Sequence, residues 1–445
     1  MKPSLSWVPL LALWFAMPAA SGADTLLIIG DSLSKEYLYE LDYIGGEDAD
    51  GIKNWNEILD QRRSQYFEYG PEGDHVDLRL IGHEYNWSVP GSDADDWWND
   101  YLSAGFPQDE LYGIPELEDQ LENDAERIVV FLGGNDLRAN YGSVYDGSLS
   151  TSTFANNLFN DIEDVVNWVL QRRKSGSEVV LVNVPHLGAT PSKNDAHPYH
   201  PTKTGRVTTA LNSVNNRLTT FAQQKNIGLA DIYSPTLGLV IADQICIGNM
   251  PILRYPPHSD GNPRYCFLGD GLHPNMPLQA LFAQIIVDAF NTKYNRSIPR
   301  ITNQEILVNI LGFRADQQFD DWLGGHGIPN AQRGAASDPE KDGVANLIEY
   351  ALDLDPAKSD AEKLPQAQWS VAGGQTWLTL TWKLRAQLCP AVTITAQQSG
   401  NLTAWQNVAA GNLLQNPDGS ISARLLRQPG DPPVFLRLKA SLVQP

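Results

Sequence analysis

Short apolar runs alternate with longer amphipathic stretches along residues 25–294 of the 445-residue chain. Runs of this kind are typical of strands buried on both faces of a parallel sheet. They occur at Thr25–Ile29, Asp77–Ile81, Ile128–Leu132, Glu178–Val184 and Gly228–Ala230. Helical periodicity is clearest at Phe154–Lys174, Thr204–Lys225 and Pro277–Tyr294. Strands that alternate with helices predict an α/β fold, a doubly wound parallel sheet in a three-layer sandwich.

The pattern changes after Arg296, where Ile301–Phe313 and Asp316–Leu323 are expected to form short helices. From Gln366 onward, apolar and polar residues alternate, which predicts a small antiparallel β domain. Its expected strands are Thr376–Trp382, Val392–Gln397, Ser420–Leu426 and Val434–Leu438. The sequence leaves open whether this domain binds carbohydrate, serves as a secretion signal or covers the larger domain. We divide the chain into residues 1–23, 24–298, 299–364 and 365–445.

Met1–Ala23 has the features of a secretory signal peptide. Lys2 supplies the positive start, Trp7–Ala16 the apolar stretch and Ser21–Ala23 a small-residue cleavage site. The apolar stretch is too short to span a membrane, and no later stretch is long enough. The sequence therefore predicts a secreted or periplasmic protein without a membrane span.

Net charge and cysteine content limit the possible partners of the protein and the ways in which its fold is stabilised. A formal net charge of −21 argues against nucleic acid and anionic membranes as partners. Three cysteines are too few for a disulfide scaffold, so the hydrophobic core must stabilise the fold. In an oxidising compartment we expect a disulfide between Cys246 and Cys266, which flank an insertion rich in Pro and Gly. Cys389 is then expected to be a buried free thiol.

Two of the predicted strands run directly into polar turns: Thr25–Ile29 leads into Gly30–Ser32, and Ile128–Leu132 leads into Gly133–Asp136. The first ends in Gly30-Asp31-Ser32, which places a serine at the sheet edge where α/β folds bind ligands. A serine hydroxyl becomes a nucleophile when a base, usually imidazole, removes its proton. Downstream, Asp270 lies three residues before His273, so a tight turn lets the carboxylate orient the imidazole ring. These residue types predict nucleophilic catalysis.

Four segments occur in the order of the four sequence blocks of the SGNH, or GDSL, hydrolases: Gly30–Ser32, Asn86–Gly91, Gly133–Asp136 and Asp270–His273. Residues 25–296 resemble that family, which implies a flavodoxin-like sandwich and catalysis without a cofactor. The resemblance assigns Ser32 as nucleophile, His273 as base and Asp270 as orienting carboxylate. It also assigns three oxyanion donors, the backbone N–H groups of Ser32 and Gly91 and the side-chain amide of Asn135. Because a long insertion precedes Gly91, Gly82 is the alternative.

Other polar residues near these motifs have simpler interpretations. We expect Asp31 and Asp136 to accept hydrogen bonds from nearby backbone rather than to act as acids or metal ligands. His197 and His200 lie in a Pro-broken loop that either binds a metal or, as we favour, borders the cleft. The remaining histidines are expected to be surface or packed residues: His75, His83, His186, His258 and His326.

The segment 338–349 has oxygen-bearing residues in the register of a calcium loop, with glycine at its sixth position. It resembles the lone EF-hand or dockerin-like loops of secreted enzymes, which implies a structural calcium ion. Its expected ligands are Asp338, Glu340, Asp342, Val344, Asn346 and Glu349. The alternative is a solvated turn that caps the helix predicted at Asn346–Leu354.

Together these features predict a secreted serine esterase that forms an acyl-enzyme. The first candidate substrates are short-acyl esters on carbohydrate, such as an acetylated polysaccharide. The insertions Lys35–Gly73 and Asp93–Gly113 are rich in aromatic and acidic residues, which either line a sugar cleft or pack on the sheet. A lipase or arylesterase that acts on longer acyl chains is the nearest alternative. A carbohydrate-binding or adhesion protein on an inactive hydrolase fold is the alternative from another class.

Overall fold

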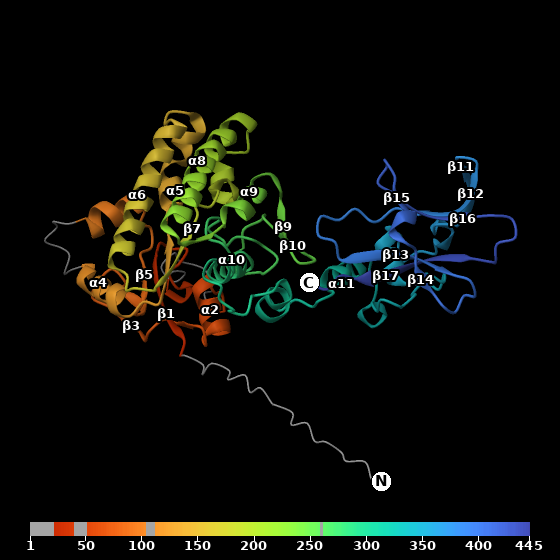
Figure 1. Ribbon diagram of the computed structural model, residues 1–445, viewed down its shortest axis with the longest axis horizontal. Coiled ribbons are helices and arrows are strands. Elements are labelled where there is room, and N and C mark those ends of the chain that lie inside the picture. Colours follow the sequence, from red (N-terminus) through yellow and green to blue (C-terminus); the bar gives the residue numbers. More distant parts are fainter. Residues whose placement is uncertain (1–21, 40–50, 104–111, 259–260) are drawn as a thin grey trace, which may run out of the picture.

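The computed structural model describes residues 22–39, 51–103, 112–258 and 261–445. Except for residues 22 and 23, the predicted signal peptide lies outside the described residues, as do parts of both aromatic insertions. Figure 1 shows a larger α/β lobe joined to a smaller, mostly β lobe at the C-terminal side of the chain. In the part of the chain that is described, no helix combines the length and apolar character needed to cross a bilayer.

The larger lobe is built on a six-stranded parallel sheet with the order β2-β1-β6-β7-β8, in which β5 also pairs with β1. Its strands are β1 (Asp24–Gly30), β2 (Phe67–Glu68), β5 (Asn86–Ser88), β6 (Arg127–Phe131), β7 (Glu178–Val182) and β8 (Gly228–Ala230). The predicted doubly wound α/β fold is confirmed.

Helices cover both faces of this sheet because its strands are apolar at nearly every position. In β1, Leu27 and Ile29 face one hydrophobic cluster, whereas Leu26 and Ile28 face the other. The first cluster is covered by α4 (Ile114–Asn123), α5 (Gly134–Asp146), α6 (Thr151–Arg172) and α8 (Pro201–Lys225). The second is covered mainly by α2 (Trp55–Arg63) and α10 (Met276–Tyr294). The alternation of side chains along a strand thus produces the three layers.

One predicted strand of the sheet is wrong. Asp77–Leu80 forms a turn in which the Asp77 carboxylate accepts hydrogen bonds from the backbone N–H and the guanidinium of Arg79. Leu80 has φ of 58°, a left-handed conformation that no regular strand contains. The chain then forms a small hairpin of β3 (Glu72–Asp74) and β4 (Ile81–His83) outside the main sheet. A local side chain–backbone interaction therefore overrides the apolar pattern.

The remaining elements of the larger lobe are short. They are η1 (Asp96–Leu102), η2 (Leu187–Ala189), α7 (Pro191–Ala196), α9 (Tyr233–Ile241), β9 (Gln244–Ile247) and β10 (Met250–Leu253). Strands β9 and β10 form an antiparallel hairpin on the side that faces the smaller lobe (Figure 1). Asn249, in the turn of that hairpin, donates hydrogen bonds from Nδ2 to the carbonyls of Ala315 and Val443. The hairpin thus contacts the C-terminal part of the chain directly.

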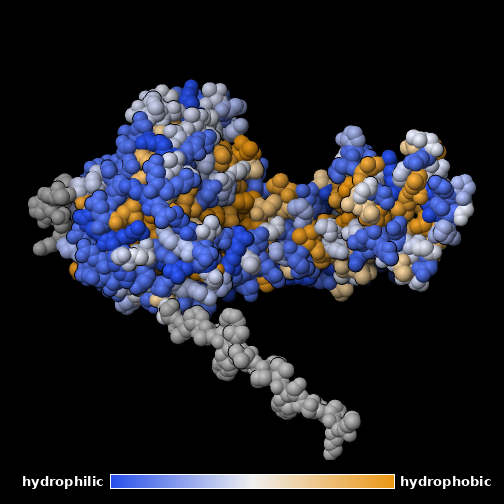
Figure 2. Space-filling view, in the orientation of Figure 1, coloured by the Kyte–Doolittle hydropathy of each residue, from blue (hydrophilic) through white to orange (hydrophobic). Residues whose placement is uncertain are grey.

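The smaller lobe contains two antiparallel sheets, as the sequence predicts, with the orders β11-β12-β16-β15 and β14-β13-β17. The strands are β11 (Gln368–Ala372), β12 (Gln375–Trp382), β13 (Val392–Ser399), β14 (Gln406–Asn407), β15 (Leu413–Gln415), β16 (Ile421–Arg427) and β17 (Phe435–Leu442). Before them lie η3 (Glu305–Ile310), α11 (Gln317–Gly325), η4 (Asn330–Gln332), α12 (Asn346–Leu352) and η5 (Ala361–Lys363), and η6 (Ala410–Asn412) precedes β15. Hydrophobic side chains gather on the visible face of this lobe (Figure 2).

The expected disulfide between Cys246 and Cys266 is wrong, because Cys246 bonds Cys389 with a Cα–Cα distance of 5.5 Å. The alternation of side chains between the two faces of β9 explains why Cys246 bonds Cys389 instead of Cys266. Ile245 and Ile247 of β9 contact the core, so Cys246 between them points the other way, toward the smaller lobe. Cys266 belongs to that core, and its buried Sγ lies 3.6 Å from the carbonyl oxygen of Ile252. The disulfide therefore links the two lobes, and Cys266 is the free thiol.

This linkage predicts how stability depends on the three cysteines. The double variant Cys246→Ala/Cys389→Ala should lose about 2–4 kcal/mol of unfolding free energy, because a long loop is no longer closed in the unfolded chain. Thermal unfolding with and without dithiothreitol measures the effect. Reductant should destabilise the wild type and the control Cys266→Ala, and leave the double variant unchanged. If Cys266→Ala instead abolished the response to reductant, the pairing would be refuted.

Candidate active site

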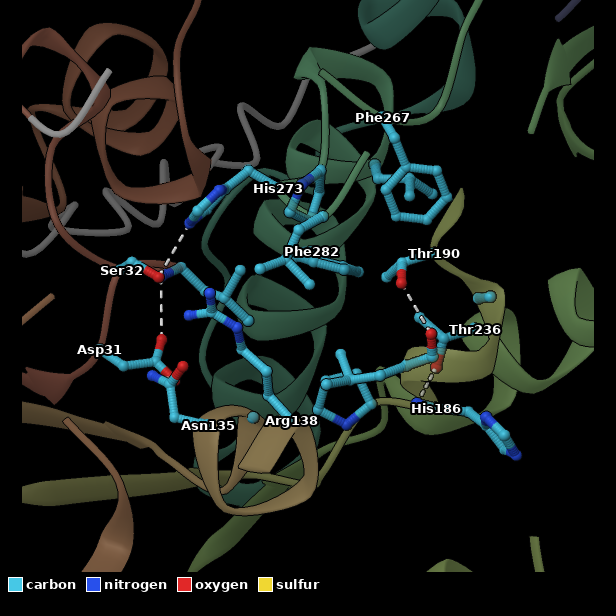
Figure 3. A pocket seen from close by; sticks show the side chains of 18 residues that line it. Asp31, Ser32, Asn135, Arg138, His186, Thr190, Thr236, Phe267, His273 and Phe282 are labelled. Carbon is cyan, nitrogen blue, oxygen red and sulfur yellow. Dashed lines mark hydrogen bonds between the residues drawn. The ribbon is translucent and has the colours of Figure 1, made fainter. Parts of the chain in front are cut away.

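The three residues of the predicted triad come together at the carboxyl end of the sheet. Ser32 lies two residues after β1, and Asp270 and His273 lie on the loop that leads into α10. His273 Nε2 lies 3.0 Å from Ser32 Oγ, and His273 Nδ1 lies 2.5 Å from Asp270 Oδ2. Serine, imidazole and carboxylate therefore form one continuous hydrogen-bonded chain (Figure 3 shows its Ser32–His273 link). This is the geometry that a base needs to remove a hydroxyl proton.

Asp270 is held in its ionised form. Burial opposes ionisation, but the hydrogen bond and charge of His273 and the backbone N–H groups of Leu272 and His273 outweigh it and lower the pKa of Asp270. Both of those N–H groups donate to Asp270 Oδ1, at 2.9 Å and 3.0 Å. Because Oδ1 is fixed by its own backbone, Oδ2 remains directed at the imidazole. The short spacing of the two residues thus sets both the tautomer and the orientation of the ring.

The topology explains why these residues meet Asn135. The chain passes from β1 to strands on one side of it and then to β6 on the other, so the carboxyl ends of β1 and β6 flank a topological switch point. Ser32 follows β1, and Asn135 lies in the first turn of α5 after β6. Asn135 Nδ2 donates to the carbonyl of Ser92 at 2.9 Å. That bond ties Asn135 to the loop that contains Gly91.

The two glycine candidates for an oxyanion donor lie in different places. Gly91 is in the exposed turn after β5, next to Ser92, and has φ of 82°. Gly82 is in the β3–β4 hairpin, where an added Cβ would lie 2.7 Å from Glu36 Oε2. Because β5 pairs in parallel with β1, Gly91 shares the sheet edge of Ser32. The structure therefore favours Gly91 over Gly82, and its role as a donor remains a prediction.

Asp31 and Asp136 are buried carboxyls that follow β1 and β6, and each accepts a hydrogen bond from a backbone N–H group. Asp31 Oδ1 accepts from Leu33 N–H at 2.9 Å, within its own turn. Asp136 Oδ2 accepts from Ala94 N–H at 3.0 Å, on a segment far away in sequence. Burial raises the pKa of Asp31 to about 6 and that of Asp136 to about 7, against these hydrogen bonds. Each carboxylate therefore costs folding free energy when it ionises.

An apolar pocket opens next to Ser32 and His273 (Figure 3). It contains about 550 Å³ of space not filled by protein atoms, part of it open to solvent. The apolar side chains that line it are Leu33, Pro185, Leu187, Ala189, Phe267, Leu272, Pro274, Leu278 and Phe282. Arg138, on α5, lines the pocket with an exposed side chain. The sequence motifs did not indicate that the apolar residues line a pocket, because apolar side chains also occupy ordinary core positions.

The loop with His197 and His200 shows no metal cluster among the described residues. The His200 ring accepts hydrogen bonds from Thr202 N–H and Lys203 N–H and caps α8, and His197 packs against Tyr141 and Tyr145. His186 lines the pocket but is fully buried, and burial lowers its pKa to about 4. These histidines therefore have structural contacts.

Several of the described aromatic residues of the two insertions are packed inside the protein. Tyr37, Trp55 and Trp97 have no exposed surface. Trp97 donates from its ring N–H to the carbonyl of Gly30, and Tyr37 donates to the carbonyl of Pro274, next to His273. These three side chains support the catalytic turns and do not line a sugar cleft.

Most of the larger lobe matches a known protein family. The family model described as GDSL-like Lipase/Acylhydrolase matches residues 26–286. None of the curated proteins matches in a sequence comparison. Among solved structures, an extracellular lipase from Streptomyces rimosus is similar, with 12% identity and a TM-score of 0.35 over 60% of this chain and 100% of that one. A putative acylhydrolase from Bacteroides fragilis has 12% identity and a TM-score of 0.29 over 61% of this chain and 91% of that one.

The position of Asn135 predicts a loss of catalysis without a loss of fold. Asn135→Ala should lower kcat for a nitrophenyl ester about 10²–10³-fold, because a donor to the developing oxyanion is removed, and KM should change little. Steady-state kinetics and circular dichroism measure the two effects. Asn140→Ala, on the same helix but outside the pocket lining, is the control and should stay close to wild type. Equal kinetics for the two variants would contradict the assignment.

The raised pKa of Asp136 predicts a pH-dependent gain of stability on neutralisation. The contribution of Asp136 to wild-type stability falls as the pH rises from about 4 to about 7, because the folded state must ionise a buried carboxyl. Asp136→Asn should therefore be more stable by about 2–4 kcal/mol at pH 8, and the gain should vanish near pH 4. Urea unfolding at several pH values measures it. The surface variant Asp119→Asn controls for net charge, and a gain independent of pH would refute the explanation.

Proposed function

The chain belongs to the GDSL-like lipase/acylhydrolase family, and we propose that it is a serine esterase in which Ser32 attacks the carbonyl carbon of a carboxylic ester. The observation that carries this proposal is the hydrogen-bonded chain from Ser32 Oγ through His273 to Asp270. The alternative of a binding or adhesion protein on an inactive fold would not require this chain to be complete. No cofactor is needed for the reaction we propose.

The proposed reaction has two displacement steps. His273 Nε2 takes the proton of Ser32 as Oγ bonds the carbonyl carbon, and the resulting oxyanion accepts hydrogen bonds from Ser32 N–H, Gly91 N–H and the Asn135 amide. The imidazolium, stabilised by Asp270, then protonates the leaving alkoxide, and the alcohol departs. Water attacks the acyl-Ser32 ester while giving its proton to His273. Ser32 recovers a proton from His273 as the carboxylic acid leaves.

The pocket beside Ser32 indicates the acyl group. Its lining is largely apolar, which favours an acyl group with more apolar surface to bury than acetyl has. The burial of Tyr37, Trp55 and Trp97 weakens the support for a sugar cleft. We therefore propose esters with acyl chains longer than acetyl, the alternative that the sequence left open, in place of an acetylated polysaccharide.

We also propose that the protein acts outside the cytoplasm. The composition of Met1–Ala23 supports export, and the Cys246–Cys389 disulfide is typical of an oxidising compartment. The net charge of −21 supports a small ester rather than a nucleic acid as the partner.

A series of nitrophenyl esters from acetyl to dodecanoyl tests the function. Wild type should hydrolyse them with kcat/KM highest at a chain longer than acetyl, and Ser32→Ala should lose activity at least 10³-fold on every ester. Circular dichroism checks that both proteins are folded. If Ser32→Ala kept wild-type activity, the nucleophile would be wrong, and if only acetyl esters were cleaved, the acyl assignment would be wrong.

A variant of the pocket wall tests the acyl site separately. Ala189→Leu adds bulk to the lining, so it should lower kcat/KM for octanoyl esters at least tenfold relative to acetyl esters. Ala409→Leu makes the same change at an exposed position of the smaller lobe and should leave the acyl preference unaltered. An equal loss on all chain lengths in Ala189→Leu would indicate general damage rather than a filled acyl site.

A further inference from the structure

The segment 338–360 holds a compact group of oxygen-bearing side chains, remote in sequence from the triad. One carboxylate oxygen each from Asp338, Glu340 and Asp342 lie within 4.8 Å of one another. The same is true of Asp342, Glu349 and Asp360. Asp342 belongs to both sets, so the two sets surround one region. Asp360 lies eleven residues beyond the loop and did not figure among the expected ligands.

Buried oxygen atoms without a hydrogen-bond partner distinguish this group from an ordinary acidic surface. Glu349 and Asn346 have no exposed surface, and Asp360 is 3% exposed. Within the described chain, neither oxygen of Glu349, nor Oδ1 of Asn346, nor Oδ1 of Asp360 has a hydrogen-bond partner. The same holds for both oxygens of Glu340. Burying an ionised carboxylate without a partner costs several kcal/mol, and a cation between these atoms would offset that cost.

The surrounding contacts leave these particular atoms available. Asn346 Nδ2 donates to the carbonyls of Gln332 and Gly334, which leaves Oδ1 as the atom without a partner. Asp360 Oδ2 receives Lys363 Nζ at 3.1 Å, and Asp360 Oδ1 remains. In both Asn346 and Asp360, hydrogen bonds of one side-chain atom thus fix the orientation, while the remaining oxygen lies buried without a partner.

We propose that this group binds one Ca²⁺ ion and that Asp360 is a ligand supplied from outside the loop. The donors are all oxygen, which suits a hard cation, and neither histidine nor cysteine is among them. Two ligand oxygens on opposite sides of a calcium ion, each 2.3–2.6 Å away, lie about 5 Å apart, which fits the observed spacing. Glu349, with two oxygens lacking partners, suits a bidentate contact, and the Val344 carbonyl supplies the seventh-position ligand.

The position of the site assigns it a structural role. Helix α12 begins at Asn346 and contains Glu349, so two of the proposed ligands lie on it. Its Tyr350 and Ala351 pack in one cluster with Phe319 of α11 and Val392 of β13. A bound ion would therefore hold α12 between α11 and the sheets of the smaller lobe. The triad lies in the other lobe, so calcium should affect stability rather than turnover.

Isothermal titration of CaCl₂ into the chelator-treated full-length protein tests the proposal. One ion should bind per chain, and the unfolding temperature should rise with the logarithm of calcium concentration. Asp360→Asn and Glu349→Gln should each weaken calcium binding at least tenfold. The matched controls Asp353→Asn and Glu362→Gln, at exposed positions nearby, should bind like wild type. Ester hydrolysis by folded samples should be unchanged by calcium or chelator.

Each part of the proposal can fail separately. A folded wild type that binds no calcium would overturn the site, and equally tight binding of Mg²⁺ would overturn the choice of ion. Wild-type affinity in Asp360→Asn would remove Asp360 from the ligand set. Loss of turnover by a still-folded chelated protein would overturn the structural role. Apart from the turnover measurement, these outcomes do not depend on the ester substrate, so they are independent of the proposed function.

Discussion

The burial of the parallel sheet on both faces is the constraint on which the rest of the structure depends. Leu26–Ile29 of β1 and Ile128–Phe131 of β6 have no exposed surface, so polar chemistry is excluded along these stretches. It is confined to the ends of the strands, where the chain turns and backbone groups become available. The reversal of strand order between β1 and β6 then leaves a crevice at their carboxyl ends. Ser32 and Asn135 lie in this crevice because buried positions within the strands cannot accommodate polar side chains that must contact a ligand.

Much of this arrangement could be predicted from the sequence, since apolar strands and the polar turns that follow them are local features. Four of the five predicted strands of the main sheet and its three clearest helices are present. The failures arise from long-range or competing local contacts. Asp77 binds Arg79 and forms a turn instead of a strand, and Cys246 points toward a lobe whose position the sequence does not reveal. Asp360 was missed because its place beside Asp342 depends on the path of the chain between them.

Three buried carboxyl groups of this protein differ in how the free-energy cost of burying a charged carboxylate is offset. Asp270 is compensated by an imidazole and two backbone N–H groups, and its pKa falls. Asp136 has a backbone N–H as its main compensation, and its pKa rises to about 7. Without a bound ion, burial and the neighbouring Glu340 raise the pKa of Glu349 to about 8, whereas the proposed Ca²⁺ would hold it ionised. The charge state of each group thus follows from its available partners rather than from the depth of burial alone.

Helix α10 connects the catalytic base with the pocket. It begins at Met276, three residues after His273, and its Leu278 and Phe282 form part of the apolar lining. Asn275 caps this helix and donates to the carbonyls of Asn262 and Tyr265, which fixes the approach of the Asp270–His273 loop. A shift of α10 would therefore move the imidazole and reshape the apolar pocket together. Because one rigid element carries both, the shape of the pocket and the position of the imidazole are set by the same packing against the sheet.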